Sequence, residues 1–219
     1  MGCIERGPLA DCAICEYMTM IDDLVGRIFD EMDAQGLWDN TLVVFFTDHG
    51  DNMGAHKLFE KGPFFDEECF RLAFIAAHPA CKQPGSTCDE FVYLQDLFPS
   101  FVEAAGLEVD SGPDTQSILP LLAGREEQTG RDSVYCQFSA QIQAHKSRMV
   151  RTRTHKFVFS QSDIGELYDL VNDPHELNNL FGLDEYKDVQ ESLMQLMQSH
   201  VERVKDSMLG EFMRVRYIY

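Results

Sequence analysis

The feature that most constrains the fold of this chain is a short apolar run between Thr41 and Thr47. Its residues, Thr-Leu-Val-Val-Phe-Phe-Thr, are rich in β-branched and aromatic side chains and show no polar alternation. This pattern is typical of a strand that is covered on both faces in a parallel sheet. Before it, Asp11–Gln35 carries apolar residues at steps of three and four positions and is followed by Gly36, which predicts an amphipathic helix that ends at a glycine. A helix, a short turn and a buried strand together predict an α/β fold.

The α/β part is expected to include a second strand at Leu72–Ala77 and a helix at Asp89–Ala105, in which Pro99 marks a kink or an earlier end. Beyond it, the pattern changes to short strand candidates separated by turns, at 133–138, 148–152 and 155–159, which predict a small antiparallel sheet. We therefore predict two domains, residues 1–125 and residues 126–219.

Two helices are expected after the small sheet. Asp173-Pro174-His175-Glu176 has the residues of a helix N-terminus, with an Asp cap, Pro at the first helical position and Glu at the third. A further helix is predicted over about residues 185–209.

Composition limits the partners of the chain. It has 18 basic and 37 acidic residues, a net charge of −19, which argues against binding to nucleic acid or to an anionic membrane surface. No apolar run approaches the roughly 20 residues of a membrane-spanning helix. The seven cysteines are an odd number at low density, which favours free thiols, and the first residues do not resemble a signal peptide. A cytoplasmic location is the expectation.

Asp48 and His49 directly follow the predicted buried strand, at its carboxyl end, where open α/β sheets place their ligands. A carboxylate and an imidazole at one rigid point bind a divalent cation if further ligands converge on it. The alternative is a structural turn in which the carboxylate accepts backbone hydrogen bonds. Lys61, thirteen positions after Asp48, is either a cation that complements an anionic substrate or a solvated surface charge.

Taken together, four ordered segments resemble the sulfatase family of the alkaline phosphatase superfamily, and phosphonate monoester hydrolases share the central block. The segments span most of the chain and are Ile21–Ile28, Asn40–Asp51, Lys61–Glu68 and Gly165–Leu180. The resemblance implies part of an alkaline-phosphatase-like sheet with flanking helices, followed by the small antiparallel sheet and C-terminal helices. The implied activity is metal-dependent hydrolysis of sulfuric esters, with phosphonate monoester or phosphodiester hydrolysis as the alternative.

Carried over by position, the resemblance makes Asp48 and His49 ligands of a divalent metal, with Ca²⁺ expected first and Mn²⁺ or Mg²⁺ as alternatives. Lys61 matches the lysine that contacts the sulfate or phosphonate group. His56 falls where relatives often have histidine, and it either lines the substrate pocket as a catalytic-site residue or makes a structural hydrogen bond.

The sequence also departs from the family pattern. Sulfatases carry, near their N-terminus, an Asp pair that completes the metal site and a Cys-x-Pro/Ala-x-Arg segment whose cysteine, often oxidised to formylglycine, is the nucleophile. None of the seven cysteines fits that segment, and Cys12-Ala13-Ile14-Cys15-Glu16 lacks its arginine. The expectation is a C-terminal half without its own nucleophile. Such a half either self-associates or needs the N-terminal half as a partner, and it is inactive by itself.

Overall fold

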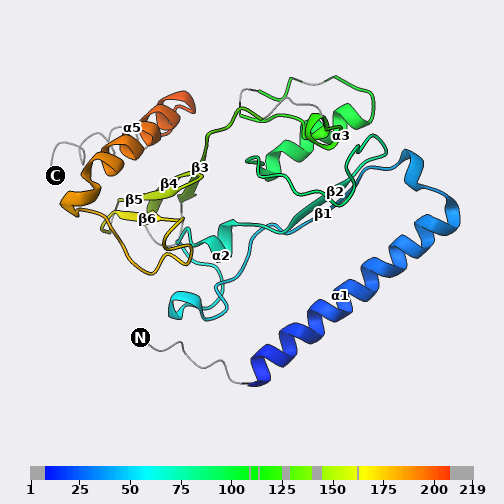
Figure 1. The fold of residues 1–219 in the computed structure, drawn as a ribbon, viewed down its shortest axis with the longest axis horizontal. Coiled ribbons are helices and arrows are strands. Elements are labelled where there is room, and N and C mark those ends of the chain that lie inside the picture. Colours follow the sequence, from blue (N-terminus) through cyan, green and yellow to red (C-terminus); the bar gives the residue numbers. More distant parts are fainter. Residues whose placement is uncertain are drawn as a thin grey trace. The chain divides into compact units, whose positions relative to one another are not determined.

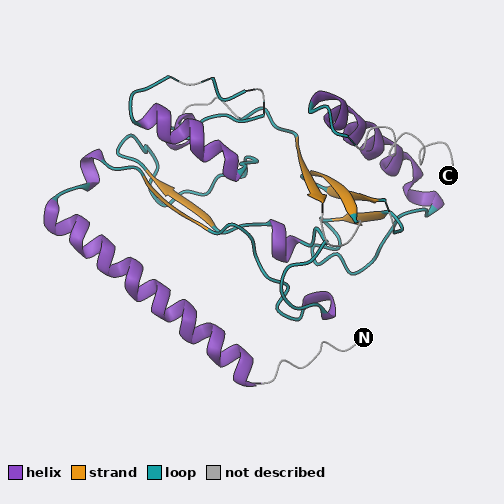
Figure 2. Cartoon of the chain, turned by 180° about the vertical axis from the view of Figure 1, so that it is seen from behind, coloured by secondary structure: helices purple, strands orange, loops and turns teal. Residues whose placement is uncertain are grey.

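A computed structural model of the protein describes residues 8–108, 110–112, 114–124, 129–139, 145–161 and 163–207, with the backbone alone for residues 8–13. The chain divides into two compact units, which are described separately: Met1–Phe59 with Leu72–Gly130, and Glu60–Arg71 with Arg131–Tyr219. Figure 1 shows the elements of both, and Figure 2 distinguishes their helices from their strands. The predicted domain boundary between residues 125 and 126 lies outside the described residues and stays a prediction.

The first unit contains one long helix and a two-stranded sheet. Its elements are α1 (Pro8–Gln35), η1 (Trp38–Asn40), β1 (Val43–Phe46), η2 (Ala55–Lys57), β2 (Phe74–Ala77), η3 (Leu94–Asp96), α3 (Leu97–Ala104) and α4 (Leu119–Leu122). The structure confirms the predicted N-terminal helix. It ends as expected at Gly36, which has a φ of 64°, and the backbone N–H of Leu37 donates to the carbonyl of Met32 at 3.0 Å.

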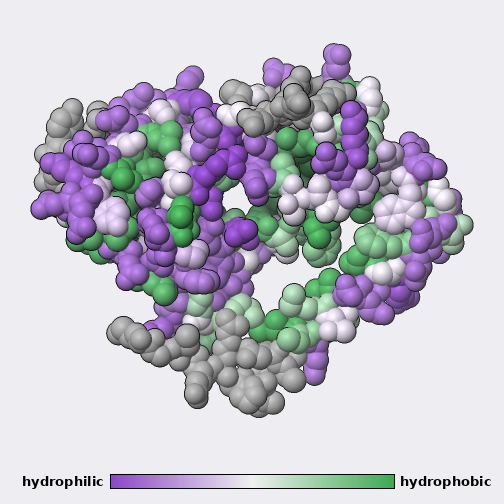
Figure 3. All heavy atoms as spheres, viewed as in Figure 1, coloured by the Kyte–Doolittle hydropathy of each residue, from purple (hydrophilic) through white to green (hydrophobic). Residues whose placement is uncertain are grey.

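The apolar stripe of α1 lies at the surface of the first unit. Met18 is 66% exposed and Ile28 is 59% exposed, whereas Met32, in the last turn, is buried. Figure 3 shows apolar atoms along this helix. The stripe predicted from the sequence is therefore present, but within the described residues most of it is not covered.

The β1 strand differs from its prediction in direction and burial. It pairs with β2 in an antiparallel ladder that runs from Val43 opposite Ala77 to Phe46 opposite Phe74. No other strand of the described residues pairs with it, and Phe45 and Phe46 stay 38% and 44% exposed. The expectation of a parallel strand covered on both faces is wrong for this ladder, because an apolar run identifies a strand but not the direction of its neighbour.

The second unit is a four-stranded antiparallel sheet in the order β3-β4-β5-β6, with α5 packed on one face. Its elements are α2 (Glu67–Phe70), β3 (Ser133–Ser139), β4 (Lys146–Thr152), β5 (His155–Ser160), β6 (Glu166–Asp169), η4 (Asp184–Tyr186) and α5 (Lys187–Arg203). Val150, Phe157 and Leu167 of the sheet form one core with Leu193 and Met197 of α5. The structure thus confirms a mixed α/β chain with a small antiparallel sheet and a C-terminal helix.

Two predicted helices differ from the structure. The segment from Asp173 forms turns instead of a helix, because Glu176 takes a left-handed φ of 53° and its side chain turns inward to Lys156. The helix predicted over 89–105 begins only at Leu97, preceded by η3. Pro99 neither kinks nor ends it, because Pro99 lies in the first turn, where backbone N–H groups have no helical acceptor.

Among the helices that the structure describes, none combines the length and the apolar character needed to cross a bilayer.

Candidate functional site

Asp48 and His49 lie together just beyond the end of β1. The His49 Nδ1 atom lies 2.7 Å from the carbonyl oxygen of Gly50, which identifies Nδ1 as the protonated nitrogen. In the neutral ring the lone pair is then on Nε2, the atom that lies 3.6 Å from Oδ2 of Asp48. The Asp48 side chain is 84% exposed and the His49 side chain 40% exposed, so both can meet a ligand. One carboxylate and one imidazole of fixed tautomer are therefore directed to the same place.

These donors suit a divalent cation, but as part of a site. Asp48 Oδ1 also accepts the backbone N–H of His49 at 3.0 Å, which is the turn contact that the structural alternative requires. In the part of the chain that the structure describes, no group of three or more His, Cys, Asp or Glu side chains could hold a metal ion. Asp48 and His49 fit two positions of a coordination shell that needs further ligands.

The loop after the pair has an unusual backbone. Met53, His56, Lys57 and Glu60 all have φ between 49° and 63°, a region that residues with a side chain rarely adopt. Hydrogen bonds within the loop hold this conformation, among them Gly54 N–H to the carbonyl of Leu58 at 2.7 Å. Clusters of such residues occur at ligand sites, where the surroundings maintain the strain. His56 lies in this loop, on η2, and is half-buried.

Asn52 is a polar residue of the same loop that the sequence did not single out. It is 1% exposed, and neither polar atom of its side-chain amide has a hydrogen-bond partner among the described residues. Buried amides are almost always bonded, so this one marks a place where a partner is expected. No sequence signal identified it, because burial of an Asn in a loop depends on how the loop folds.

Lys61 belongs to the second unit, unlike the other three predicted site residues. It is exposed and lies near the start of the segment Glu60–Arg71, which groups with the antiparallel sheet. The next residue, Gly62, leaves room for the Phe64 ring, because a Cβ atom there would lie 2.6 Å from that ring. The structure therefore brings Asp48 and His49 together, places His56 on the loop that follows them, and assigns Lys61 to the other unit.

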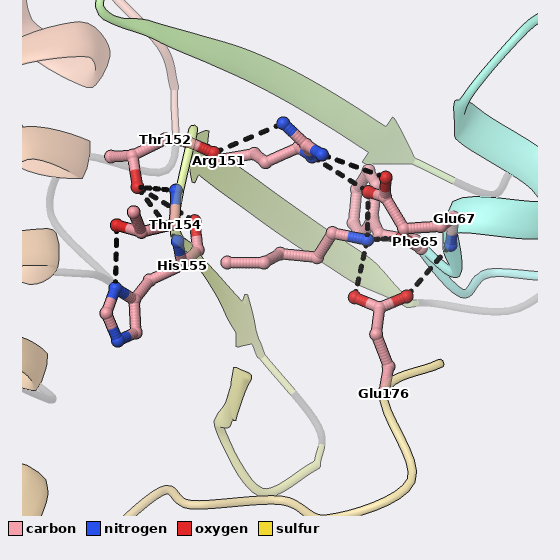
Figure 4. Close-up of polar contacts among 8 residues, drawn as sticks. Phe65, Glu67, Arg151, Thr152, Thr154, His155 and Glu176 are labelled. Carbon is pink, nitrogen blue, oxygen red and sulfur yellow. Dashed lines mark hydrogen bonds and ion pairs between the residues drawn. The ribbon is translucent and has the colours of Figure 1, made fainter. Parts of the chain in front are cut away.

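A buried ion-pair network holds the segment that carries Lys61. Lys156 of β5 is 1% exposed, and its Nζ atom lies 2.8 Å from Glu67 Oε1, 2.6 Å from Glu176 Oε1 and 2.7 Å from the Phe65 carbonyl. Arg151 of β4 donates two hydrogen bonds to the Glu67 carboxylate, at 2.9 and 3.0 Å (Figure 4). Two basic and two acidic side chains thus neutralise one another in a network whose centre, Lys156, is buried.

The two carboxylates of this network have opposite pKa shifts. Burial raises the pKa of Glu67, but the hydrogen bonds from Arg151 and the charge of Lys156 outweigh it and bring the value below its usual 4.5. For Glu176 burial dominates, and its pKa stays above 4.5 in spite of the Lys156 charge. Glu67 is therefore the more strongly held anion.

This network was not predicted from the sequence. One signal was present, a lysine at position 156 within the apolar strand His155–Phe159, because a buried lysine needs an anionic partner. The identity of the partners could not be read from the sequence, since Glu67 is 89 positions away and Glu176 lies in a turn that was predicted as a helix.

Comparison with known proteins agrees with the resemblance that the sequence motifs indicated. The family model for N-sulphoglucosamine sulphohydrolase, C-terminal, matches residues 54–203, more than half of the chain. A second family model, described as a protein of unknown function, DUF229, matches residues 12–81.

Individual relatives agree with the family models. N-acetylglucosamine-6-O-sulfatase of Bacteroides thetaiotaomicron is 32% identical over 85% of this chain and 35% of its own length. The structure of BT4656 in complex with its substrate D-glucosamine-2-N,6-O-disulfate is 31% identical, has a TM-score of 0.80, and is matched over 87% of this chain and 40% of that chain. The phosphonate monoester hydrolase of Agrobacterium radiobacter is 27% identical, with a TM-score of 0.74, over 82% of this chain and 38% of that chain.

This chain thus spans less than half of the length of these relatives. The shared part includes the loop from Gly54, the Lys61 segment, the antiparallel sheet and the whole of α5. The chain belongs to the sulfatase family of hydrolases in the alkaline phosphatase superfamily, and it corresponds to the C-terminal part of that family.

Proposed function

We propose that this chain supplies two metal ligands and the substrate-binding lysine of a metal-dependent sulfuric ester hydrolase. The observation that carries this proposal is the pair at the end of β1, where the Nε2 atom of His49 and the Asp48 carboxylate lie 3.6 Å apart at the surface. Ca²⁺ is the expected metal, and Mn²⁺ or Mg²⁺ are the alternatives.

Each residue has a defined role in this proposal. A divalent cation, when bound, would polarise the sulfate oxygens and activate the nucleophile. Asp48 contributes a hard anionic oxygen, and His49 contributes a neutral nitrogen whose direction the Gly50 carbonyl fixes. The Lys61 ammonium binds the anionic sulfate group and offsets negative charge as the ester bond breaks. His56 lies on the loop with positive φ angles and lines the proposed substrate pocket.

The sequence of this chain contains no candidate for the family's nucleophile. None of its cysteines matches the family's nucleophile segment. We infer that the nucleophile, formylglycine in the sulfatase case, and the Asp pair that completes the metal site come from an N-terminal half. This chain is then inactive by itself and requires that half as a partner.

Phosphonate monoester or phosphodiester hydrolysis is the second candidate. Two observations favour it: the 27% identity with a phosphonate monoester hydrolase and the Gly62-Pro63 that follows Lys61. Sulfate and phosphonate groups are both tetrahedral anions, so the same lysine serves either reaction.

The two most similar relatives named above have sulfated glucosamines in their names, which makes a sulfated amino sugar the first substrate to test.

Anion binding by the purified chain tests the role of Lys61. We expect weak binding of inorganic sulfate, observed as chemical-shift changes of the Lys61 loop. Lys61→Met should weaken it about tenfold, because a hydrogen bond to a charged group is lost. Lys57→Met is the matched control, since Lys57 is an exposed lysine four positions earlier, and it should leave the affinity unchanged.

Equal loss of sulfate affinity in both lysine variants, or none in Lys61→Met, would contradict the proposed role. Tighter binding of methylphosphonate than of sulfate, still dependent on Lys61, would favour the second candidate over the first.

A further inference from the structure

The segment that carries Lys61 packs with a sheet that lies far from it in the sequence. Glu60–Arg71 groups with the second unit, although the chain on both sides of it, up to Phe59 and from Leu72, belongs to the first unit. Something in the second unit must therefore hold this segment. The buried polar contacts of the second unit identify what holds it.

Lys156 is the centre of those contacts. Of the three oxygens around its Nζ atom, two belong to the segment, the Phe65 carbonyl at 2.7 Å and Glu67 Oε1 at 2.8 Å. The third, Glu176 Oε1, lies at 2.6 Å, and the other oxygen of the same carboxylate accepts the backbone N–H of Glu67 at 2.9 Å. An ammonium group has three protons to donate, and three oxygens surround it.

The link from this centre to Lys61 is short and stiff. Phe65, whose carbonyl bonds Lys156, is 3% exposed and packs against Met149 and Val158 of the sheet. Between Phe65 and Lys61 stand Pro63, with its fixed φ, and Gly62, which lies against the Phe64 ring. Only three residues, Gly62, Pro63 and Phe64, separate Lys61 from Phe65, so the position of the Phe65 carbonyl limits where the lysine can lie.

We propose that Lys156 is a positioning residue for Lys61: its ammonium group, held by Glu67, Glu176 and the Phe65 carbonyl, fixes Glu60–Arg71 on β5 and thereby sets where the Lys61 side chain begins. This rests on the proposed sulfate-binding role of Lys61. Glu67 and Glu176 act with Lys156, and Arg151 completes the charge balance.

Another buried ion pair in the same sheet provides a matched control. Arg148 of β4 donates to both carboxylate oxygens of Asp206, at 2.6 and 3.0 Å, and both residues are buried. Asp206 also accepts a hydrogen bond from Tyr135. These hydrogen bonds join Asp206 to β3 and β4 and do not include the segment Glu60–Arg71, so loss of the Asp206 charge tests whether any buried charge has the same effect.

Hydrogen–deuterium exchange on the full chain tests the proposal without metal or sulfate. Lys156→Met should speed exchange of the amides in residues 62–71 at least about tenfold while α5 keeps its protection. Lys156→Arg, which retains the cation, should restore most of the protection. Asp206→Asn should leave residues 62–71 as in the wild type. If Lys156→Met does not fold, the isosteric Glu176→Gln replaces it with the same expected exchange.

Sulfate affinity supplies the functional readout: it should fall in Lys156→Met, recover in Lys156→Arg and stay unchanged in Asp206→Asn. The proposal is overturned if residues 62–71 keep wild-type exchange in a folded Lys156→Met or Glu176→Gln variant, or if Asp206→Asn loosens them equally. It is also overturned if these residues loosen but sulfate affinity does not change. Failure of Lys61→Met to alter sulfate binding would instead remove the proposed function, which makes the two failures distinguishable.

Discussion

At the residue scale, two glutamates of the second unit illustrate how neighbours determine the charge of a buried carboxyl group. Burial raises the pKa of both, yet Glu67 ends below 4.5 because Arg151 and Lys156 bind its anion. Glu166 ends above 4.5, because burial outweighs its hydrogen bond from Tyr168. Relative to the unfolded chain, folding therefore stabilises the anion at Glu67 and the neutral acid at Glu166.

This difference predicts opposite effects of pH on two matched variants. A group with a lowered pKa stabilises the fold above its unfolded value and loses that contribution as pH falls. Glu67→Gln should therefore destabilise the chain by on the order of 3 kcal/mol at neutral pH, as expected when one partner of a buried network is removed. The difference from the wild type should shrink as pH falls below 4.5, the unfolded value of Glu67. Urea unfolding over a range of pH measures it.

Glu166→Gln is the control for this series. A raised pKa penalises the carboxylate in the folded state, so this variant should gain stability relative to the wild type as pH rises through and above 4.5. If both variants follow the same pH trend, the assignment of the anionic charge to Glu67 is wrong.

At the scale of elements, a helix or strand could be predicted from the sequence when the contacts that determine it lie within its own segment. The repeating apolar residues of α1 and the short runs of strand-forming residues between turns in β3, β4 and β5 are properties of their own segments, and these elements were predicted correctly. The helix expected from Asp173 was not, although its capping residues are all present. Glu176 is drawn to Lys156, a partner 20 positions away, and this buried ion pair outweighs the local preference for a helix.

The same distinction between local and distant contacts applies to the candidate site. Asp48 and His49 are neighbours in the chain, so their proximity followed from the sequence once a strand was predicted before them. The His49 tautomer depends on the Gly50 carbonyl. The proposed positioning of Lys61 depends on Phe65, Lys156 and Glu176. Neither could be predicted from residue types alone. Direction and pairing of β1 were likewise beyond the sequence pattern.

At the scale of the whole molecule, the first unit presents large apolar side chains at its surface, the kind of surface that a partner usually covers. The exposed stripe of α1 includes Met18, Ile21 and Ile28, and β1 has an antiparallel partner on one edge among the described residues. We propose that an N-terminal half covers these surfaces in the working enzyme. Without it, the apolar residues are available to a second copy of the chain.

Self-association of the purified chain is therefore expected, together with binding of a hydrophobic dye. Ile28→Lys, on α1, should shift the chain toward monomer in light scattering coupled to gel filtration. Ile164→Lys should not, since Ile164 is similarly exposed but lies in the second unit. A wild-type chain that is monomeric and binds no dye would contradict this prediction.

Calorimetric titration of the chain with Ca²⁺ and with Mn²⁺ tests whether Asp48 and His49 are metal ligands of a sulfatase site. With two ligands from this chain, we predict one weak site with a dissociation constant of about 10⁻⁴ to 10⁻³ M. Asp48→Asn and His49→Ala should abolish it. Asp51→Asn should not, because the Asp51 carboxylate is used to bond the backbone of Met53. Binding that survives Asp48→Asn, or that is lost equally in Asp51→Asn, would contradict the claim.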